Sequence, residues 1–453
     1  MVDKKSKKDE AKVMNRWIVV IGAIMIQVAL GAIYAWSAFA TPLKGVLGNG
    51  KVEAIVSEFA FTATETQAIF AAGLATFAIF TIIGGRLSKK YGPRNIALLG
   101  GALLGLGYII ASFVGANFVL KLISLGIIGG AGIGLAYVVP IAVGVKWFPD
   151  KKGLVSGLAV AGFGFGAFIW ILLANPPSIL GFNGLITQQA GKFAYTIANV
   201  DMAFRIYGIL FLVLVIIGSL VMVNPPKGWK PKGWKPSKEE EDDEKKKSLL
   251  PKQMLGTRQF YLLWMMFLIG ALAGLMVIGN IKIFAEGADG FQRFGFSQVD
   301  AESFAIIGAA ICLPIFNGLG RIIWGKVSDN IGRKRALITM CIFQGVMMLS
   351  FYYTTVNPLF FFVAAALIGF NFGANFALFP AATADSFGSE NVGLNYGFVF
   401  TSYGVGGIVG PILAGIVKDA GLSFLYAFIP AAVLCFIAAG LAILYKPTVK
   451  SKA

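Results

Sequence analysis

Histidine is absent from this chain of 453 residues, and only 13% of the residues carry a charge. Without histidine, the chain lacks the commonest metal ligand and the side chain most used for proton transfer near neutral pH. The three cysteines, Cys312, Cys341 and Cys435, lie in apolar runs, where small packing residues are expected and nothing is implied about disulfides. We therefore expect no metal, no cofactor and no enzymatic activity.

What the chain has in abundance is apolar sequence, at 57% of the residues and a mean hydropathy of +0.77. The apolar runs recur at lengths of about 20–25 residues, which is enough to cross ~30 Å of hydrocarbon as a helix. This pattern predicts an all-α polytopic membrane protein with twelve transmembrane helices. They are expected at 16–41, 65–87, 94–115, 118–146, 152–173, 203–223, 258–284, 302–325, 335–354, 358–383, 393–417 and 423–445.

The net charge of +17 follows the predicted topology. With the N-terminus placed in the cytoplasm, 30 of the 39 Lys and Arg residues fall on that side and 8 on the other. An excess of basic residues in cytoplasmic segments is the known orientation signal of membrane proteins. We therefore predict a multi-pass protein of the cell membrane with both termini in the cytoplasm. A nucleic-acid partner is not expected.

The two halves of the chain resemble each other when shifted by 240 residues. Five of seventeen positions agree between KKGLVSGLAVAGFGFGA (151–167) and NVGLNYGFVFTSYGVGG (391–407), and two further patches match at the same offset. The repeat predicts two pseudo-symmetric six-helix bundles with a binding site between them. The expected divisions are a tail (1–15), a bundle (16–223), a charged linker (224–257), a second bundle (258–445) and a tail (446–453).

The segment GKVSDNIGRKR, from 325, resembles the loop signature of the major facilitator superfamily. The resemblance implies the fold of that family, in which this loop and its first-half counterpart act in gating. The expected gating residues are Gly85, Lys89, Gly92 and Arg94 in the first copy and Gly325, Asp329, Gly332 and Arg333 in the second. Gly325 is expected to permit close helix approach, and Asp329 to meet a helix end or an arginine. Lys89 departs from the pattern, because an acidic residue is expected there and a lysine accepts no hydrogen bond.

A narrower resemblance, to the oxalate–formate antiporter family and its bacterial monocarboxylate relatives, covers most of the chain. YAWSAFATPLK, WFPDKKGLVSG and FNGLGRIIWGKVSDNIGR carry it. In that family the arginine of helix 8 binds the substrate carboxylate, and Arg321 occupies its place. The resemblance also puts Tyr34, Tyr137 and Gln67 at cavity positions, while Tyr403 stands where oxalate carriers are expected to have a lysine.

Arg321 lies in a run that carries no other charge from Ser303 to Gly320. A charged side chain inside a membrane is costly, by about 2.5 kcal/mol or more, so it must face a cavity or a partner. At helical spacing it shares a face with Pro314, Asn317 and Gly318. A guanidinium can bind a carboxylate through two parallel hydrogen bonds. The alternative is that Arg321 reaches the cytoplasmic interface or pairs with Asp329.

The predicted function is therefore transport of a small carboxylate. One fixed cation favours a monocarboxylate (formate, acetate, lactate or pyruvate) over oxalate, with anion exchange or a co-transported proton. No mid-helix carboxylate is expected to carry a proton, since Asn317 stands where eukaryotic monocarboxylate transporters have an aspartate. An oxalate–formate antiporter, a carrier of an unrelated solute with a structural Arg321, and a receptor or intramembrane enzyme remain alternatives. We expect a monomer whose partners are the substrate and the bilayer, with binding residues Arg321, Tyr34, Tyr137, Tyr403, Asn317, Gln67, Phe372, Phe376 and Trp36.

Overall fold

A computed structural model describes residues 14–44, 46–47, 54–55, 57–148, 152–176, 183–186, 196–226, 229–231, 248–388 and 391–446. Within these ranges, twelve helices are long and apolar enough to cross a membrane. The predicted all-α chain with twelve spanning helices is confirmed. The predicted tails and the linker 224–257 lie largely outside the described residues, so that division of the chain stays a prediction.

Six spanning helices come from the first half of the chain, and several are built from more than one helical segment. The elements of this half are α1 (Arg16–Leu30), η1 (Gly31–Ala35), α2 (Ser37–Leu43), α3 (Ala63–Tyr91), α4 (Pro93–Ala111), α5 (Phe118–Lys121), η2 (Leu122–Gly129), α6 (Gly130–Trp147), α7 (Lys152–Ala174) and α8 (Ile197–Leu220). Two strands of two residues each, β1 (Val46–Leu47) and β2 (Ala54–Ile55), pair antiparallel between α2 and α3.

The second half contributes the other six spanning helices. Its elements are α10 (Pro251–Met254), α11 (Arg258–Glu286), η4 (Phe291–Phe294), α12 (Gln298–Ile306), η5 (Ile307–Cys312), α13 (Leu313–Ile331), α14 (Arg333–Phe351), η6 (Tyr352–Val356), α15 (Pro358–Phe387), α16 (Val392–Asp419) and α17 (Leu425–Leu444).

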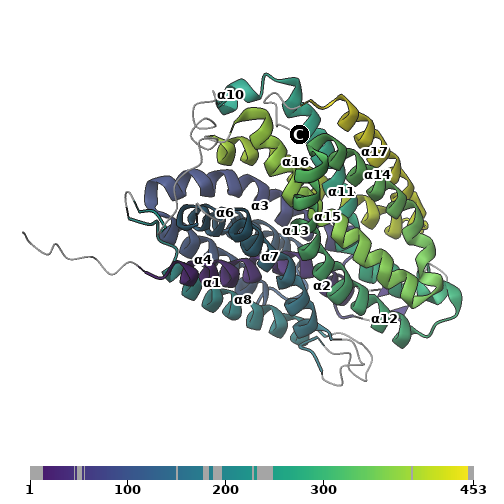
Figure 1. Ribbon diagram of the computed structural model, residues 1–453. Helices are drawn as coiled ribbons and strands as arrows, with labels where there is room; N and C mark the ends of the chain where they lie inside the picture. Colours follow the sequence, from purple (N-terminus) through teal and green to yellow (C-terminus); the bar gives the residue numbers. More distant parts are fainter. Residues whose placement is uncertain are drawn as a thin grey trace, which may run out of the picture.

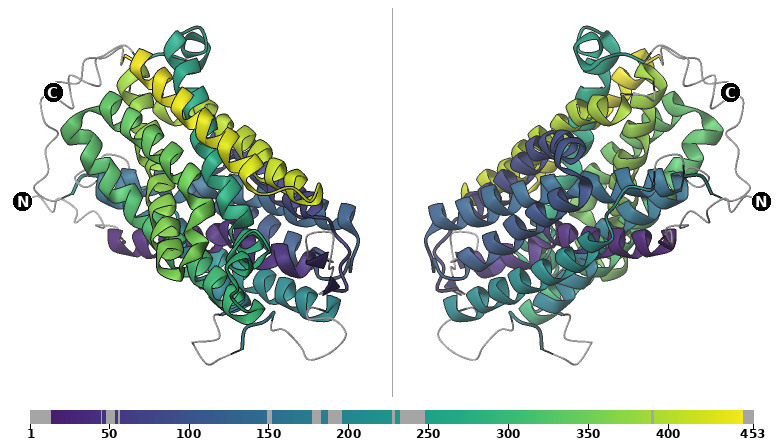
Figure 2. Two further views of the ribbon diagram at one scale, coloured as in Figure 1. Left: turned by 90° about the vertical axis from the view of Figure 1, so that its right-hand side faces the viewer. Right: turned by 90° about the vertical axis from the view of Figure 1, so that its left-hand side faces the viewer.

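The two halves meet where α3 packs along α16 and where α7 packs on α13, at the centre of Figure 1. Helices α14 and α17 form the outer side of the second half (Figure 1). Figure 2 shows the beginning of α1, in purple, and the end of α17, in yellow, on the same side of the molecule. We call this side the termini end and the opposite side the far end.

Hydropathy underestimated two helices because their first turns are polar. The helix predicted at 203–223 begins at Ile197, where the Thr196 hydroxyl accepts a hydrogen bond from Asn199 N. The helix predicted at 302–325 begins at Gln298 and is capped in the same way by Ser297. Side-chain oxygens at such positions satisfy the first N–H groups of a helix, whatever its hydropathy.

The short loop expected around Asp329 is not found. Helix α13 continues past Asp329 to Ile331, and Gly332 alone makes the turn into α14. The first half repeats this arrangement, with Gly85 and Lys89 inside α3, Gly92 in the turn and Arg94 in α4. Gly92 and Gly332 both have a φ of +85°, which explains glycine at both turns and reproduces the predicted repeat.

The close helix approach expected at Gly325 is not found. A Cβ added there would lie 3.8 Å from the Ala377 side chain, and one at Gly85 would meet nothing within 4 Å. Neither glycine is therefore needed for packing in this arrangement of the helices.

Candidate functional site

Arg321 is buried between the two halves, with 5% of its surface exposed. Its Nε donates to Asn317 Oδ1 at 2.9 Å, one turn earlier on α13, and its Nη1 donates to the Val160 carbonyl of α7 at 3.0 Å. Neither form of the alternative is found: the guanidinium does not reach the surface, and Asp329 instead pairs with Arg333 at 2.6 Å.

The Arg321 charge has no acidic partner among the residues that the structure describes. Among the same described residues, no acceptor is found for two buried donors, Arg321 Nη2 and Asn317 Nδ2. Leaving a buried polar group unsatisfied costs about 1–3 kcal/mol, and more when the group is charged. Two unused donors one helical turn apart, beside an uncompensated positive charge, are suited to the two oxygens of a carboxylate.

The position of this helix segment is fixed by Gly373 of α15. A Cβ at Gly373 would lie 2.3 Å from the backbone carbonyl oxygen of Asn317 and 3.0 Å from the backbone nitrogen of Arg321. Only a residue without a side chain allows the α15 backbone to come this close to α13. The side chains that carry the two unused donors are thus held by this backbone contact and by the hydrogen bonds of Arg321 Nε and Nη1.

Phenylalanine rings surround the guanidinium on two sides. Its carbon lies 4.2 Å from the centre of the Phe376 ring and 5.9 Å from that of Phe163. The Phe372 ring packs against Phe376 with centroids 5.5 Å apart. Aromatic faces attract a buried cation by about 2 kcal/mol, yet they accept no conventional hydrogen bond. They therefore hold the arginine in place and leave its outer N–H groups available.

Three tyrosines complete the wall of the site. The Tyr34 and Tyr403 hydroxyls are 2.9 Å apart and join the two halves, and Tyr137 packs against Phe163 with ring centroids 5.5 Å apart. All three hydroxyls lie close enough to Arg321 to interact electrostatically with its positive charge. The structure thus brings Arg321, Asn317, Tyr34, Tyr137, Tyr403, Phe372 and Phe376 together, as expected.

Several residues of this cluster were not predicted, Phe77 and Tyr396 among them. Phe77 of α3 lies with its ring centroid 5.0 Å from that of Tyr137 and 5.7 Å from that of Tyr403. Tyr396 also interacts with the Arg321 charge. A position seven residues before Tyr403 lies on the same helix face, so spacing could have identified Tyr396. Phe77 gave no such signal, because it has no polar atom in an apolar helix.

Trp36 and Gln67 belong to a separate cluster nearer the far end. Trp36 stacks on Phe70 with centroids 6.3 Å apart, and Gln67 Nε2 donates to the Gly279 carbonyl at 3.2 Å. Gly279 lies farther along α11 than the point where that helix meets Phe372. Trp36 and Gln67, which were predicted to bind substrate, therefore lie apart from the Arg321 cluster and closer to the far end.

At the termini end, the charged residues of the repeated motif differ between the halves. Arg333 contacts Asp329 at 2.6 Å and Asp385 at 3.1 Å. In the described part of the first half, the side chains of Lys89 and Arg94 make no hydrogen bond or ion pair. Among the described residues, the ionic contact around this turn is thus found only in the second half.

Three carboxylates near the ends of spanning helices lie within ion-pair distance of a lysine. Lys121 Nζ lies 2.6 Å from Asp201 Oδ1 in the first half. In the second half, Lys282 lies 3.8 Å from Glu286 and 3.2 Å from Glu302. Asp201 and Glu302 are each the fifth residue of their helices, α8 and α12, and Glu286 is the last residue of α11. The expectation that no carboxylate stands in mid-helix is therefore not contradicted by these three acids. Asp201 pairs with Lys121, and Glu286 and Glu302 share Lys282; such pairing is how buried charges are normally tolerated.

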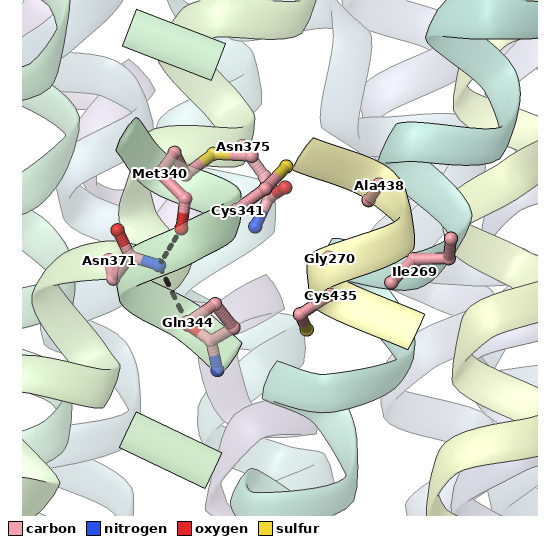
Figure 3. Close-up of a pocket in the computed structure, with 9 residues that line it drawn as sticks. All are labelled: Ile269, Gly270, Met340, Cys341, Gln344, Asn371, Asn375, Cys435 and Ala438. Carbon is pink, nitrogen blue, oxygen red and sulfur yellow. Dashed lines mark hydrogen bonds between the residues drawn. The ribbon is translucent and has the colours of Figure 1, made fainter. Parts of the chain in front are cut away.

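A small cavity of about 10 Å³ lies inside the second half, away from Arg321 (Figure 3). Asn371 Nδ2 donates to the Met340 carbonyl at 3.0 Å and to Gln344 Oε1 at 2.8 Å (Figure 3). This volume suits a single water molecule and is too small for an organic substrate. The lining residues are Ile269, Gly270, Met340, Cys341, Gln344, Asn371, Asn375, Cys435 and Ala438.

Comparison with known proteins places the chain among transporters. The profile of the Major Facilitator Superfamily matches residues 17–316 and 294–453. An uncharacterised MFS-type transporter, YhjX, of Escherichia coli is 30% identical, over 87% of this chain and 86% of its own length. The oxalate:formate antiporter of Oxalobacter formigenes is 28% identical (94% and 91%), and apicoplast pyruvate carrier 1 of Toxoplasma gondii is 25% identical (86% and 81%).

A solved structure of the xylose transporter XylE from E. coli is similar in fold. It aligns with a TM-score of 0.66 over 97% of this chain and 99% of that chain, at 12% sequence identity. The arrangement of the helices is therefore that of a known transporter fold.

Proposed function

Because the chain belongs to the Major Facilitator Superfamily, we propose that it transports a small monocarboxylate anion by alternating access. The observation that carries this proposal is the pair of unused donors, Arg321 Nη2 and Asn317 Nδ2, beside a buried charge without an acidic partner among the described residues. A carboxylate supplies both acceptors and the missing negative charge. Formate, acetate, lactate and pyruvate share this group.

The surroundings of Arg321 favour one carboxylate over two. An apolar wall is formed by Phe163, Phe372 and Phe376. It suits the hydrogen of formate or the short hydrocarbon tail of a larger monocarboxylate. A second carboxylate would need a second cation, but the only basic residue of α16 is Lys418, which lies beside Gly287 at the far end. The relatives named above include carriers of oxalate and formate and of pyruvate, so small carboxylates agree with both lines of argument.

The basic residues support an orientation with the termini end in the cytoplasm. Most Lys and Arg residues lie in segments on that side of the predicted topology. We propose the cell membrane as the location and a monomer as the working unit, since the site is formed between the two halves of one chain.

Thermal unfolding of the purified full-length protein tests the substrate class. Formate, acetate, lactate and pyruvate should raise the unfolding midpoint by several degrees, because a ligand at ~100 times its Kd stabilises the folded state by about 2.7 kcal/mol. Xylose and neutral amino acids should have no effect. A shift with a neutral solute and none with any carboxylate would contradict the proposed function, and a larger shift with oxalate would reverse the preference for monocarboxylates.

Counterflow in proteoliposomes tests the mode of transport. An empty site with a buried, uncompensated Arg321 is unfavourable when both ends are closed, so return without substrate should be slow. We expect internal unlabelled substrate to accelerate uptake of labelled substrate at least tenfold, with a protonophore making no difference. Uptake that requires a proton gradient would exclude exchange and would direct attention to the buried acids.

A further inference from the structure

Helices α11, α14, α15 and α17 meet around the small cavity of Figure 3, and three buried amide side chains line it. Gln344 comes from α14, while Asn371 and Asn375 lie one turn apart on the same face of α15. Each of these side chains is at most 3% exposed. The other residues that line the cavity are apolar or carry sulfur. A polar atom that faces the cavity must therefore find its partner inside it.

The orientation of the three amides is set by neighbouring carbonyl groups. Asn371 Nδ2 donates to the Met340 backbone carbonyl at 3.0 Å and to Gln344 Oε1 at 2.8 Å. Asn375 Nδ2 donates to the Phe372 backbone carbonyl at 3.0 Å. A carbonyl oxygen can only accept, so the nitrogen of each asparagine must face it, and the opposite end of each amide follows. Asn371 Oδ1, Asn375 Oδ1 and Gln344 Nε2 are left without a partner among the described residues.

The three unpaired atoms match the hydrogen-bonding capacity of one water molecule. Two of them are acceptors and one is a donor, and a buried water molecule typically makes three hydrogen bonds, of which it can donate two. The cavity, of about 10 Å³, is large enough for one water molecule. A cation is disfavoured, because the Gln344 amide would point its N–H groups at it and none of the described lining residues is acidic. An anion is disfavoured by the two amide oxygens.

Other faces of α15 carry part of the Arg321 site. Phe376, which follows Asn375 in the chain, has its ring centre 4.2 Å from the guanidinium carbon. Gly373 lies against the α13 backbone, on the side of α15 opposite to the amides. A Cβ at Gly270 of α11 would lie 2.5 Å from Asn375 Oδ1, so this amide is tightly enclosed. Helix α15 is thus held by α13 on one side and by the amide cluster on the other.

We propose that one water molecule, bound by Gln344, Asn371 and Asn375, bridges α14 and α15, and that these amides are positioning residues for the carboxylate site. The water accepts a hydrogen bond from Gln344 Nε2 and donates one to each asparagine Oδ1. The bridge completes the hydrogen bonding of α15 on the side away from α13 and so fixes the Phe376 ring against Arg321. The positioning role rests on the proposed function, whereas the bound water does not.

Diffraction from crystals of the full-length protein tests the water directly. A single density peak is expected at about 3 Å from Gln344 Nε2 and from both asparagine Oδ1 atoms. In solution, replacing sodium and potassium by choline should leave the unfolding midpoint unchanged. Absence of the peak would overturn the proposal. A midpoint that falls in choline for the unmodified protein, and not for Asn375→Leu, would assign the cavity to a cation and would overturn it as well.

A double-mutant cycle tests the bridge, because no direct hydrogen bond joins the described side chains of Gln344 and Asn375. Gln344→Met and Asn375→Leu keep the overall shape of each side chain and remove its polar atoms. Either substitution breaks the bridge. The double variant should therefore lower the unfolding midpoint by clearly less than the sum of the two single shifts.

Asn280→Leu is the matched control for Asn375→Leu. Asn280 Nδ2 likewise donates to a backbone carbonyl of its own helix, that of Met276 at 3.0 Å, and its Oδ1 has no partner among the described residues. Asn280 does not line the cavity, so Gln344→Met and Asn280→Leu should lower the midpoint additively. Additive shifts in the cavity pair, or equal departures from additivity in both pairs, would overturn the bridge.

The affinity for pyruvate, measured by competition between labelled and unlabelled substrate, tests the positioning role. Gln344→Met should weaken it roughly tenfold, equivalent to about 1.4 kcal/mol. Asn280→Leu, which also removes a buried amide, should bind pyruvate as the unmodified protein does. Equal affinities in the two variants would refute the positioning role. If the unmodified protein binds no carboxylate, the proposed function fails, and the density and the double-mutant cycle still decide whether the water is bound.

Discussion

Arg321→Gln is expected to reduce carboxylate affinity by ~100-fold, equivalent to about 2.7 kcal/mol. The substitution removes the only positive charge that the described part of the site presents, together with the unused Nη2 donor. Arg321→Lys should retain part of the binding, since it keeps the charge and loses the fixed Nη2 donor. Uptake into proteoliposomes over a range of substrate concentrations measures both variants.

Folding must be separated from binding in this experiment, because Arg321 also donates to the Val160 carbonyl. Removing an unpaired buried charge is expected to leave the stability of the unliganded protein unchanged or higher. Thermal unfolding of Arg321→Gln should therefore show a normal or raised midpoint and no shift on adding carboxylate. A variant that unfolds early without ligand would indicate a structural arginine, and unchanged uptake would refute the binding role.

Asn317→Asp is expected to weaken carboxylate binding at least tenfold, or about 1.4 kcal/mol. Arg321 Nε already donates to Asn317 Oδ1 at 2.9 Å, so an aspartate there would form an ion pair without moving the helix. The new carboxylate would neutralise the guanidinium and would replace the Nδ2 donor with an acceptor. Competition between unlabelled and labelled substrate gives the change in affinity.

The neutral variant Asn317→Ser separates charge from the loss of the amide. It removes the Nδ2 donor without adding a charge, so its affinity should fall by less than that of Asn317→Asp. Equal effects of the two substitutions would mean that the donor matters and the charge does not. Wild-type affinity in Asn317→Asp would show that the substrate does not use the guanidinium.

Much of the fold was predictable because membrane insertion imposes a simple rule on sequence. A spanning helix must be apolar for about 20 residues, and this rule located all twelve helices. Their ends were less predictable, since caps such as Thr196 and Ser297 depend on hydrogen bonds that hydropathy ignores. The 240-residue repeat predicted the matching turns at Gly92 and Gly332.

The core of the candidate site could be proposed from the sequence because Arg321 is anomalous in its surroundings. A charge in an apolar helix attracts attention, and the family resemblance supplied Tyr34, Tyr137 and Tyr403. Phe77 and the backbone contact at Gly373 could not be found in this way, because the fold alone brings them to the arginine. The far-end carboxylates were missed for a related reason, as Glu286 reaches Thr41 only after the chain has folded.

The contact at Gly373 has a consequence for related carriers. A side chain at this position would push α15 off the α13 backbone and shift the guanidinium relative to the aromatic rings. Gly373 therefore acts as a sequence marker for the register of the two helices. A homologue with a larger residue there must hold its arginine in a different place, so its substrate has to be inferred separately.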